Sequence, residues 1–425
     1  MYSHSETVNP MMKLAILAAL RAGKKVSEDY YKKLLMSPNT AHSSFLKSPQ
    51  QLVTETDIAS DLIIKNTLYE RLNDYIILSE EGLKVIAHGD SNFCWIIDPL
   101  DGTTNFAKGI SYFVVAITLV EHKSGQPVLA VVYNPITTEL YTAEHKKGCY
   151  LHILNKHQGI LNQHIDEKEF LENETFLNIL QDPSCFIALQ CQQDIILNHE
   201  ILIDTGSSLP HAQYAKRLQH LMQLGEITFR DLSSAILTAA KTANFAKVTA
   251  SITDDVHIWD IAPSILMIEE AGGVLANVNG QDFGLKDYMQ QAIKNYLSTL
   301  CVSESEREEA FLDAVKKDIG SMIISFSREF LEERIIPCLI TPVDKVNHGA
   351  EGFGQECSVV QFGMFSPPGK SDDMSHSTID PTPTLIFGAL EEQHTPLENP
   401  SEQRPRPEIE ITKSSFCIGS QFRNA

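Results

Sequence analysis

The first part of the chain has the spacing of an amphipathic helix. Between Met11 and Leu35, apolar residues recur at intervals of three and four, and the turn Ser37-Pro38-Asn39 follows. This period places them on one stripe, which predicts a helix with one buried face. A second helix is predicted over Asp57–Leu72, with Thr54 or Thr56 as its N-cap. Its inward side chains are expected to be Ile58, Leu62, Tyr69 and Leu72.

Short apolar runs predict strands further along. The runs Tyr75–Leu78 and Phe93–Ile97 are both followed by acidic residues. A Lys-Ser-Gly-Gln-Pro turn between two longer runs, Tyr112–Glu121 and Val128–Tyr133, is typical of a hairpin. Gly272-Gly273 is expected to close a helix as a C-cap pair. The remaining predicted elements are strands at Glu139–Ala143, Cys149–Ile153 and Val274–Val278, and helices at Ser233–Ala246 and Ile258–Ala271.

The character of the chain changes after about residue 317. The residues beyond it hold ten of the nineteen Pro, are rich in Ser, Thr and Glu, and lose apolar periodicity after Gly349. Such a segment buries too little apolar surface to offset the entropy of ordering it. We therefore expect a folded domain over residues 10–317 and a largely disordered extension over 318–425. Within the extension, Met322–Leu339 is apolar enough to dock as a helix or strand.

Charge narrows the classes of partner. Lys and Arg number 34 against 55 Asp and Glu, a net charge of −21. This argues against a direct nucleic-acid binder and against docking on anionic lipid, since both need a basic face. A small anionic substrate is compatible if bound cations reverse the local field.

Cysteine usage and hydropathy predict a cytoplasmic protein. None of the eight Cys forms a CxxC pair, which argues against a zinc ribbon. The short apolar run Leu14–Leu20 is followed, not preceded, by basic residues, the wrong polarity for a secretory signal. Apolar runs such as Phe113–Val120 are far shorter than the ~18–20 residues that span a bilayer.

One stretch, from Trp95 to Phe106, carries the chemistry. An apolar strand leads to Asp98, and Pro-Leu places a second carboxylate at Asp101, before Gly102 and Thr103. Two carboxylates this close repel each other unless a cation lies between them. Magnesium is bound through few carboxylates together with water and phosphate oxygens. Gly102 allows close backbone approach and Thr103 offers a hydroxyl that can orient or deprotonate a water, so the stretch predicts a magnesium-dependent phosphate site.

This stretch resembles the first signature of the inositol monophosphatase family of magnesium-dependent, lithium-sensitive phosphatases, and in particular its bacterial members. Three further blocks of that family occur in the same order. They are Leu52-Val53-Thr54-Glu55-Thr56-Asp57, the pair Glu80-Glu81, and Trp259-Asp260 followed by Glu270-Ala271-Gly272-Gly273. The resemblance covers about residues 10–317. It implies an α/β (α+β) fold, the layered αβαβα sandwich shared with fructose-1,6-bisphosphatase.

The resemblance also implies roles for individual residues. Two or three Mg²⁺ would be bound by the carboxylates of Glu80, Asp98, Asp101 and Asp260 and by the Leu100 carbonyl, with Asp98 bridging two ions. Thr103 would activate the attacking water with Asp57 as its partner, and Lys47 would complete that polar group. The amides near Gly102, Thr103 and Thr104 would hold the phosphate, so that the substrate lies against Glu80, Asp101, Gly102, Thr103, Thr104 and Asp260.

The function implied is hydrolysis of a small phosphomonoester, with myo-inositol 1-phosphate as the foremost candidate. Members of the family are commonly dimeric, which is compatible with a homodimer here. Two alternatives stay open. The string Leu78-Ser79-Glu80-Glu81 leans toward the 3′(2′),5′-bisphosphate nucleotidases of the same superfamily, whereas Thr104-Asn105 leans toward the inositol phosphatases. The unusual extension is compatible with a non-catalytic regulatory partner.

Overall fold

The computed structural model describes residues 9–35, 44–48, 51–69, 75–86, 92–121, 123–157, 186–190, 199–204, 219, 227–244, 250–283, 285–286 and 320–340. All of them belong to one compact unit, Met1–Gly349. Residues after 340 lie outside the described part, so the predicted disorder of the extension stays a prediction. No helix within the described ranges is long and apolar enough to cross a membrane.

The larger sheet has eight strands in the order β10-β9-β8-β7-β6-β5-β3-β4. Within it β3 and β5 run parallel, and every other neighbouring pair is antiparallel. The predicted hairpin is confirmed as β6 with β7, and the predicted strands Glu139–Ala143 and Cys149–Ile153 are confirmed as β8 and β9, which pair with each other. The strand bounds are β3 Tyr75–Ser79, β4 Gly82–Ile86, β5 Phe93–Asp101, β6 Val114–Glu121, β7 Gln126–Asn134, β8 Glu139–Glu144, β9 Gly148–Ile153 and β10 Phe186–Leu189.

The smaller sheet has five strands in the order β12-β11-β13-β15-β14. β15 (Met322–Ser325) runs antiparallel to both of its neighbours, so this sheet is also mixed. The expectation that Met322–Leu339 docks as a helix or strand is therefore confirmed, and the sheet extends beyond residue 317. The other strands are β11 His199–Asp204, β12 Ile227–Arg230, β13 Ala250–Thr253 and β14 Val274–Ala276, while β1 Ser44–Ser48 and β2 Gln51–Thr54 form a separate pair.

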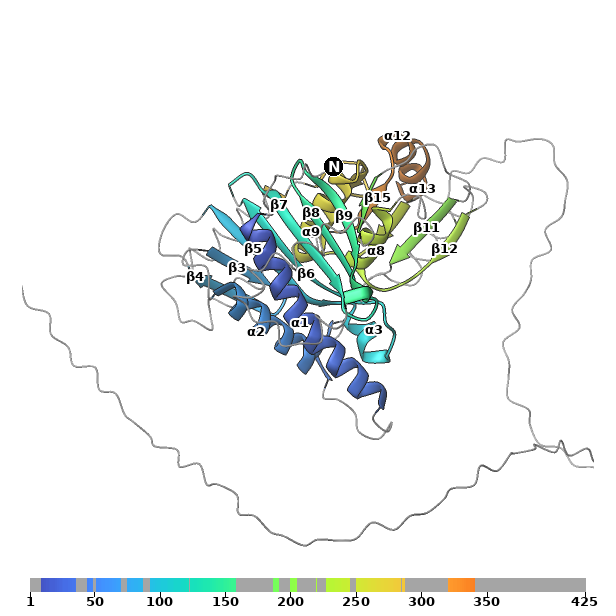
Figure 1. Cartoon of the computed structure of the whole chain (residues 1–425). Coiled ribbons are helices and arrows are strands. Elements are labelled where there is room, and N and C mark those ends of the chain that lie inside the picture. The colour runs from blue at the N-terminus through green and yellow to red at the C-terminus, as the bar shows by residue number, and fades with distance from the viewer. Residues whose placement is uncertain are drawn as a thin grey trace, which may run out of the picture. The chain divides into compact units, whose positions relative to one another are not determined.

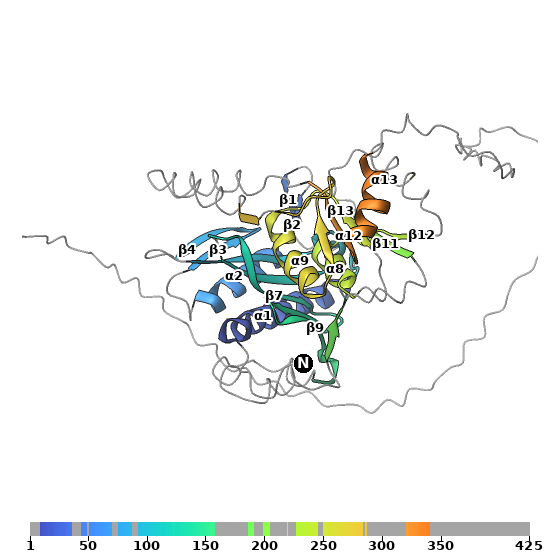
Figure 2. The ribbon, with the colours of Figure 1, turned by 90° about the horizontal axis from the view of Figure 1, so that it is seen from above.

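Helices separate and cover the two sheets. Long α1 (Pro10–Leu35) and α2 (Glu55–Tyr69) lie side by side on one face of the larger sheet, and α8 (Ala235–Thr242) and α9 (Ile258–Glu270) lie on its other face (Figures 1 and 2). One buried apolar cluster joins α8 and α9 to both sheets. The outer face of the smaller sheet is covered by Leu331 and Ile335 of a π-helical turn between α12 (Arg328–Phe330) and α13 (Ile336–Ile340). These five layers confirm the predicted αβαβα sandwich.

The buried face of α2 differs from the prediction. Ile58, Leu62 and Tyr69 are 46%, 57% and 51% exposed, and the helix ends at Tyr69, before Leu72. The prediction that these side chains face inward was therefore wrong, while Leu72 lies outside the described residues. The helix instead buries a mixed face, because its polar side chains have partners on α1, on β5 and at the ends of β3 and β4. The buried residues are Thr56, Asp57, Ser60, Asp61, Ile64, Lys65, Thr67 and Leu68.

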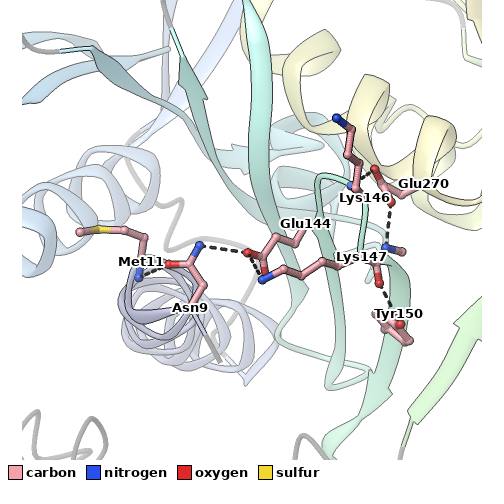
Figure 3. A network of polar contacts seen from close by, with 8 residues as sticks. Asn9, Met11, Glu144, Lys146, Lys147, Tyr150 and Glu270 are labelled. Atoms are coloured by element: carbon pink, nitrogen blue, oxygen red, sulfur yellow. Dashed lines mark hydrogen bonds and ion pairs between the residues drawn. The ribbon is translucent and has the colours of Figure 1, made fainter. Parts of the chain in front are cut away.

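A polar network joins the β8–β9 turn to two helices on opposite faces of the sheet (Figure 3). Both carboxylate oxygens of Glu270, at the end of α9, accept backbone N–H groups, from Lys146 at 2.6 Å and from Gly148 at 2.8 Å. Glu144 in turn accepts hydrogen bonds from Asn9 and Lys147, at 3.1 and 2.8 Å. The C-terminal end of α9 is thereby fixed to the sheet, opposite the end that carries Asp260.

Candidate metal centre

A bulge in β5 brings two carboxylates to the same face of the larger sheet. In a regular strand, residues three apart point to opposite faces. Here Asp98 pairs with Ala116 and Asp101 with Val114, so three steps along β5 match two along β6. The extra residue lies where Pro99 has no N–H to give the ladder. The predicted strand Phe93–Ile97 thus continues to Asp101, and both carboxylates face α8 and α9.

Three carboxylates meet at this point. Asp98, Asp101 and Asp260 each offer an oxygen, and these oxygens lie within 4.8 Å of one another. Asp260 comes from the first turn of α9, and all three side chains are buried. Residues that are far apart in the sequence therefore form one cluster, with Asp98 and Asp101 on β5 and Asp260 on α9.

Burial and mutual repulsion act on these carboxyl groups. Burial, and then the charges of Glu80, Asp101 and Asp260, raise the pKa of Asp98 well above its usual range. Burial and the charge of Asp260 raise the pKa of Asp101 to about 7, against the lowering effect of its hydrogen bonds from Ser234 and from backbone amides. The backbone N–H of Glu80 donates to the Ile97 carbonyl at 3.1 Å, so the Glu80 main chain lies next to the residue that precedes Asp98. A cation bound here would relieve the same repulsion.

Asp101 also holds the start of α8. Its carboxylate accepts the side-chain hydroxyl of Ser234 and three backbone N–H groups in the first turn of that helix. A carboxylate is stabilised at a helix N-terminus because the amides there have no partner within the helix. The amides belong to Ala235, Ile236 and Leu237, at 3.1, 3.0 and 3.2 Å.

Asp260 is fixed in a similar way. Its Oδ2 accepts the backbone N–H of His257 at 2.7 Å, and the imidazole Nδ1 of His257 lies 3.7 Å from the same oxygen. The His257 ring stacks on Trp259, with centroids 4.8 Å apart and an interplanar angle of 1°. Burial lowers the pKa of His257, but its hydrogen bond to Asp260 and the nearby charges, led by Asp260, raise it to a net increase.

A hydroxyl lies next to the carboxylate cluster. The Thr103 Oγ1 is 2.8 Å from Asp57 Oδ1 and 3.0 Å from the Leu100 carbonyl oxygen. The other oxygen of Asp57 accepts the backbone N–H of Thr54 at 2.9 Å and also its hydroxyl. Burial raises the pKa of Asp57, while the hydrogen bonds from Thr54 and Thr103 lower it, and the net effect is an increase. The predicted partnership of Thr103 and Asp57 is present in the geometry.

Position 102 requires a glycine because of its backbone conformation and its close neighbours. Its φ of 90° is left-handed, and a Cβ there would lie 2.8 Å from the Tyr112 carbonyl oxygen. It caps α3 (Thr103–Lys108), which follows it directly. A side chain at this position would therefore move the residues on which Asp101 and Thr103 depend.

The structure describes the side chains of two of the other predicted site residues, Leu100 and Thr104, but not that of Lys47. Leu100 is buried within the β5 bulge, and Thr104 is exposed at the start of α3. Lys47 lies on β1, but its side chain is outside the described part, so its proposed role stays a prediction. Sequence reasoning missed Ser60, whose hydroxyl donates to the Pro99 carbonyl at 2.8 Å, and Ser234, the partner of Asp101. A polar stripe on an otherwise apolar helix was the available signal for Ser60.

The donors present fit magnesium. Mg²⁺ prefers carboxylate and carbonyl oxygens over nitrogen or sulfur. Asp98, Asp101 and Asp260 supply such oxygens at a mutual spacing that one ion can bridge. Three buried acidic side chains this close together would otherwise be costly to ionise.

Comparisons with known proteins agree on a family. The sequence model of the inositol monophosphatase family matches residues 7–317. An inositol-1-monophosphatase of Rhizobium meliloti is 29% identical over 277 residues, which cover 64% of this chain and 86% of that protein. A protein named Nus factor SuhB from Pasteurella multocida is 29% identical over 273 residues, 64% and 87% of the two chains. The solved structure of extragenic suppressor protein SuhB from Bartonella henselae superposes with a TM-score of 0.55 at 25% identity, and covers 79% of this chain and 100% of that one.

Proposed function

Because the chain belongs to the inositol monophosphatase family of phosphomonoesterases, we propose that it hydrolyses myo-inositol 1-phosphate to inositol and phosphate with the help of Mg²⁺. The observation that carries the proposal is the meeting of Asp98, Asp101 and Asp260 within 4.8 Å. Thr103 begins α3 two residues after Asp101, so a phosphate drawn to the cations would meet its hydroxyl. The name of the Rhizobium meliloti relative supports the choice of substrate.

In this proposal Asp98, Asp101, Asp260 and Glu80 bind the cations, with the Leu100 carbonyl as a further ligand. When bound, Mg²⁺ supplies positive charge that stabilises the phosphoryl transition state and the leaving oxygen. The same charge makes an acidic protein locally attractive to a phosphate dianion. Family resemblance supports two or three ions, and the amides near Gly102, Thr103 and Thr104 as phosphate ligands.

Thr103 and Asp57 move the proton. The Thr103 hydroxyl donates to Asp57. The lone pairs of the Thr103 oxygen can then accept a hydrogen from an attacking water. Burial raises the pKa of Asp57 despite its hydrogen bonds from Thr54 and Thr103, so its carboxylate is a better proton acceptor than an exposed one. The water oxygen then bonds to phosphorus, the bond from phosphorus to the inositol oxygen breaks, and that oxygen takes a proton from solvent.

Two alternatives remain as second candidates. The Ser-Glu-Glu turn at Ser79–Glu81 favours a bisphosphate nucleotide as substrate, as the sequence indicates. The name Nus factor, carried by the Pasteurella multocida relative, favours a regulatory role. A cytoplasmic location and a homodimer are part of the proposal and rest on the sequence and the family.

A substrate comparison tests the proposal. Purified protein is assayed for phosphate release from D-myo-inositol 1-phosphate and from adenosine 3′,5′-bisphosphate, with excess Mg²⁺ and with EDTA. We expect the higher kcat/KM on the inositol phosphate and no release in EDTA. A higher kcat/KM on the nucleotide selects the first alternative, and no release from either substrate selects the second.

A further inference from the structure

The turn between β3 and β4, which carries Glu80, is hydrogen-bonded to an ion pair on α2. Lys65 and Asp61 lie one helical turn apart, with Nζ and Oδ2 separated by 2.7 Å. Asp61 accepts the Ser79 hydroxyl at 2.5 Å, and Lys65 donates to the Gly82 carbonyl at 3.2 Å. Ser79 and Gly82 pair with each other across the two-residue turn, so the ion pair contacts both of its ends.

Burial makes this pair unusual. Asp61, Lys65 and Ser79 are 7%, 8% and 0% exposed. Two charges lose their hydration in such a place, and a buried ion pair often stabilises a fold no better than apolar residues would. We therefore look for a role other than stability, and the hydrogen bonds that join the pair to other described residues lead to the two ends of the Glu80 turn.

The same helix also contacts the other carboxylate-bearing segment. Ser60, on the buried face of α2, donates to the Pro99 carbonyl between Asp98 and Asp101. The backbone N–H of Glu80 donates to the Ile97 carbonyl at 3.1 Å, directly before Asp98. One helix face thus holds the Glu80 turn and the β5 bulge at a set separation.

We propose that the Asp61–Lys65 pair is a positioning device for Glu80, which sets where its carboxylate stands relative to Asp98. The proposal rests on the proposed function only in taking Glu80 as a metal ligand. Outer groups that orient ligands in this way typically change metal affinity by about 10–100-fold when removed.

The test removes the pair without leaving an uncompensated charge. The double variant Asp61→Asn/Lys65→Met is neutral and close in volume to the original. The matched control is Lys25→Met, which breaks an i,i+4 pair of the same length on α1, where Lys25 Nζ lies 2.7 Å from Asp29. Manganese binding is measured by calorimetry in the absence of substrate, and the Mg²⁺ dependence of phosphate release is measured beside it.

We expect the double variant to bind Mn²⁺ about tenfold more weakly or worse, and to need correspondingly more Mg²⁺ for half-maximal activity. At saturating Mg²⁺ its kcat recovers toward that of the wild type, and Lys25→Met binds Mn²⁺ as the wild type does. Equal Mn²⁺ affinity in the double variant and Lys25→Met, with only the melting temperature lowered, overturns the proposal.

A milder variant keeps the test decisive if the double variant does not fold. Ser79→Ala leaves the ion pair intact and removes only the hydroxyl that joins it to the turn, so we expect about fivefold weaker Mn²⁺ binding. Unchanged binding in Ser79→Ala then overturns the proposal. Absence of Mn²⁺ binding by the wild type would instead refute the proposed function, which separates the two failures.

Discussion

At the scale of single residues, Thr103 offers a clear separation of roles. Its hydroxyl touches Asp57 and the Leu100 carbonyl, and it is not part of the apolar core. Because its proposed task is realised in the transition state, Thr103→Ala should lower kcat by about 10²–10⁴-fold with little change in KM or melting temperature. Thr103→Ser keeps the hydroxyl and should keep most of the rate. A raised KM with unchanged kcat in Thr103→Ala would make Thr103 a phosphate contact instead.

Two buried thiols among the described residues give a second prediction at this scale. Burial raises the pKa of Cys94 to about 12, against a lowering backbone hydrogen bond at Leu78, and burial followed by the charge of Glu270 raises the pKa of Cys149. Both groups stay protonated at pH 8, below their raised pKa, and a protonated thiol is a poor nucleophile. Iodoacetamide should leave both unmodified in the native protein and alkylate both in urea, as read by peptide mass spectrometry. Alkylation of either within minutes in the native state would contradict their burial.

At the scale of elements, α2 provides a matched pair of variants. Ile64 is fully buried against α1 and the larger sheet, whereas Leu62 is 57% exposed. Ile64→Ala should lower the free energy of unfolding by about 2–5 kcal/mol, from lost transfer energy and a cavity. Leu62→Ala should change it by less than about 1 kcal/mol. Urea unfolding measures both, and equal losses would mean that Leu62 is covered by something outside the described residues.

Elements differed in how well their patterns predicted them. The helix over Met11–Leu35 and the strands β6 to β9 follow from apolar spacing, because their buried faces are mainly apolar. For α2 the same reasoning chose the wrong face, since Asp57, Ser60 and Asp61 are buried by partners distant in sequence. The spacing of apolar residues carries no information about those partners. The β5 bulge could not be predicted for a related reason, because the register of β5 depends on the neighbouring strand β6.

At the scale of the whole molecule, β15 shows that the folded part continues beyond residue 317. The family match stops at residue 317, but β15 (Met322–Ser325) lies between β13 and β14 in the smaller sheet. A chain ending near residue 345 should fold and keep its phosphatase activity. A chain ending at 317 should lose both, because it exposes two unpaired strand edges and the apolar face behind them. Circular dichroism and phosphate release compare the two, and loss of activity at 345 would place essential structure beyond it.

The four sequence blocks predicted the fold through the family that they resemble, and the acidic residues of two of these blocks meet in the carboxylate cluster. Asp98 and Asp260 stand 162 positions apart, yet both lie in the cluster. Substrate choice was not predictable to the same degree. It depends on side chains around the leaving group, and the four sequence blocks do not include them.

The most direct test of a magnesium-dependent phosphatase is the rate of phosphate release from D-myo-inositol 1-phosphate by Asp98→Asn. The variant replaces the buried carboxylate at the centre of the cluster by a neutral group of the same shape. With saturating Mg²⁺ we expect kcat to fall by about three decades or more, with the fold retained by circular dichroism. Near wild-type turnover in Asp98→Asn would contradict the metal assignment and the account built on it.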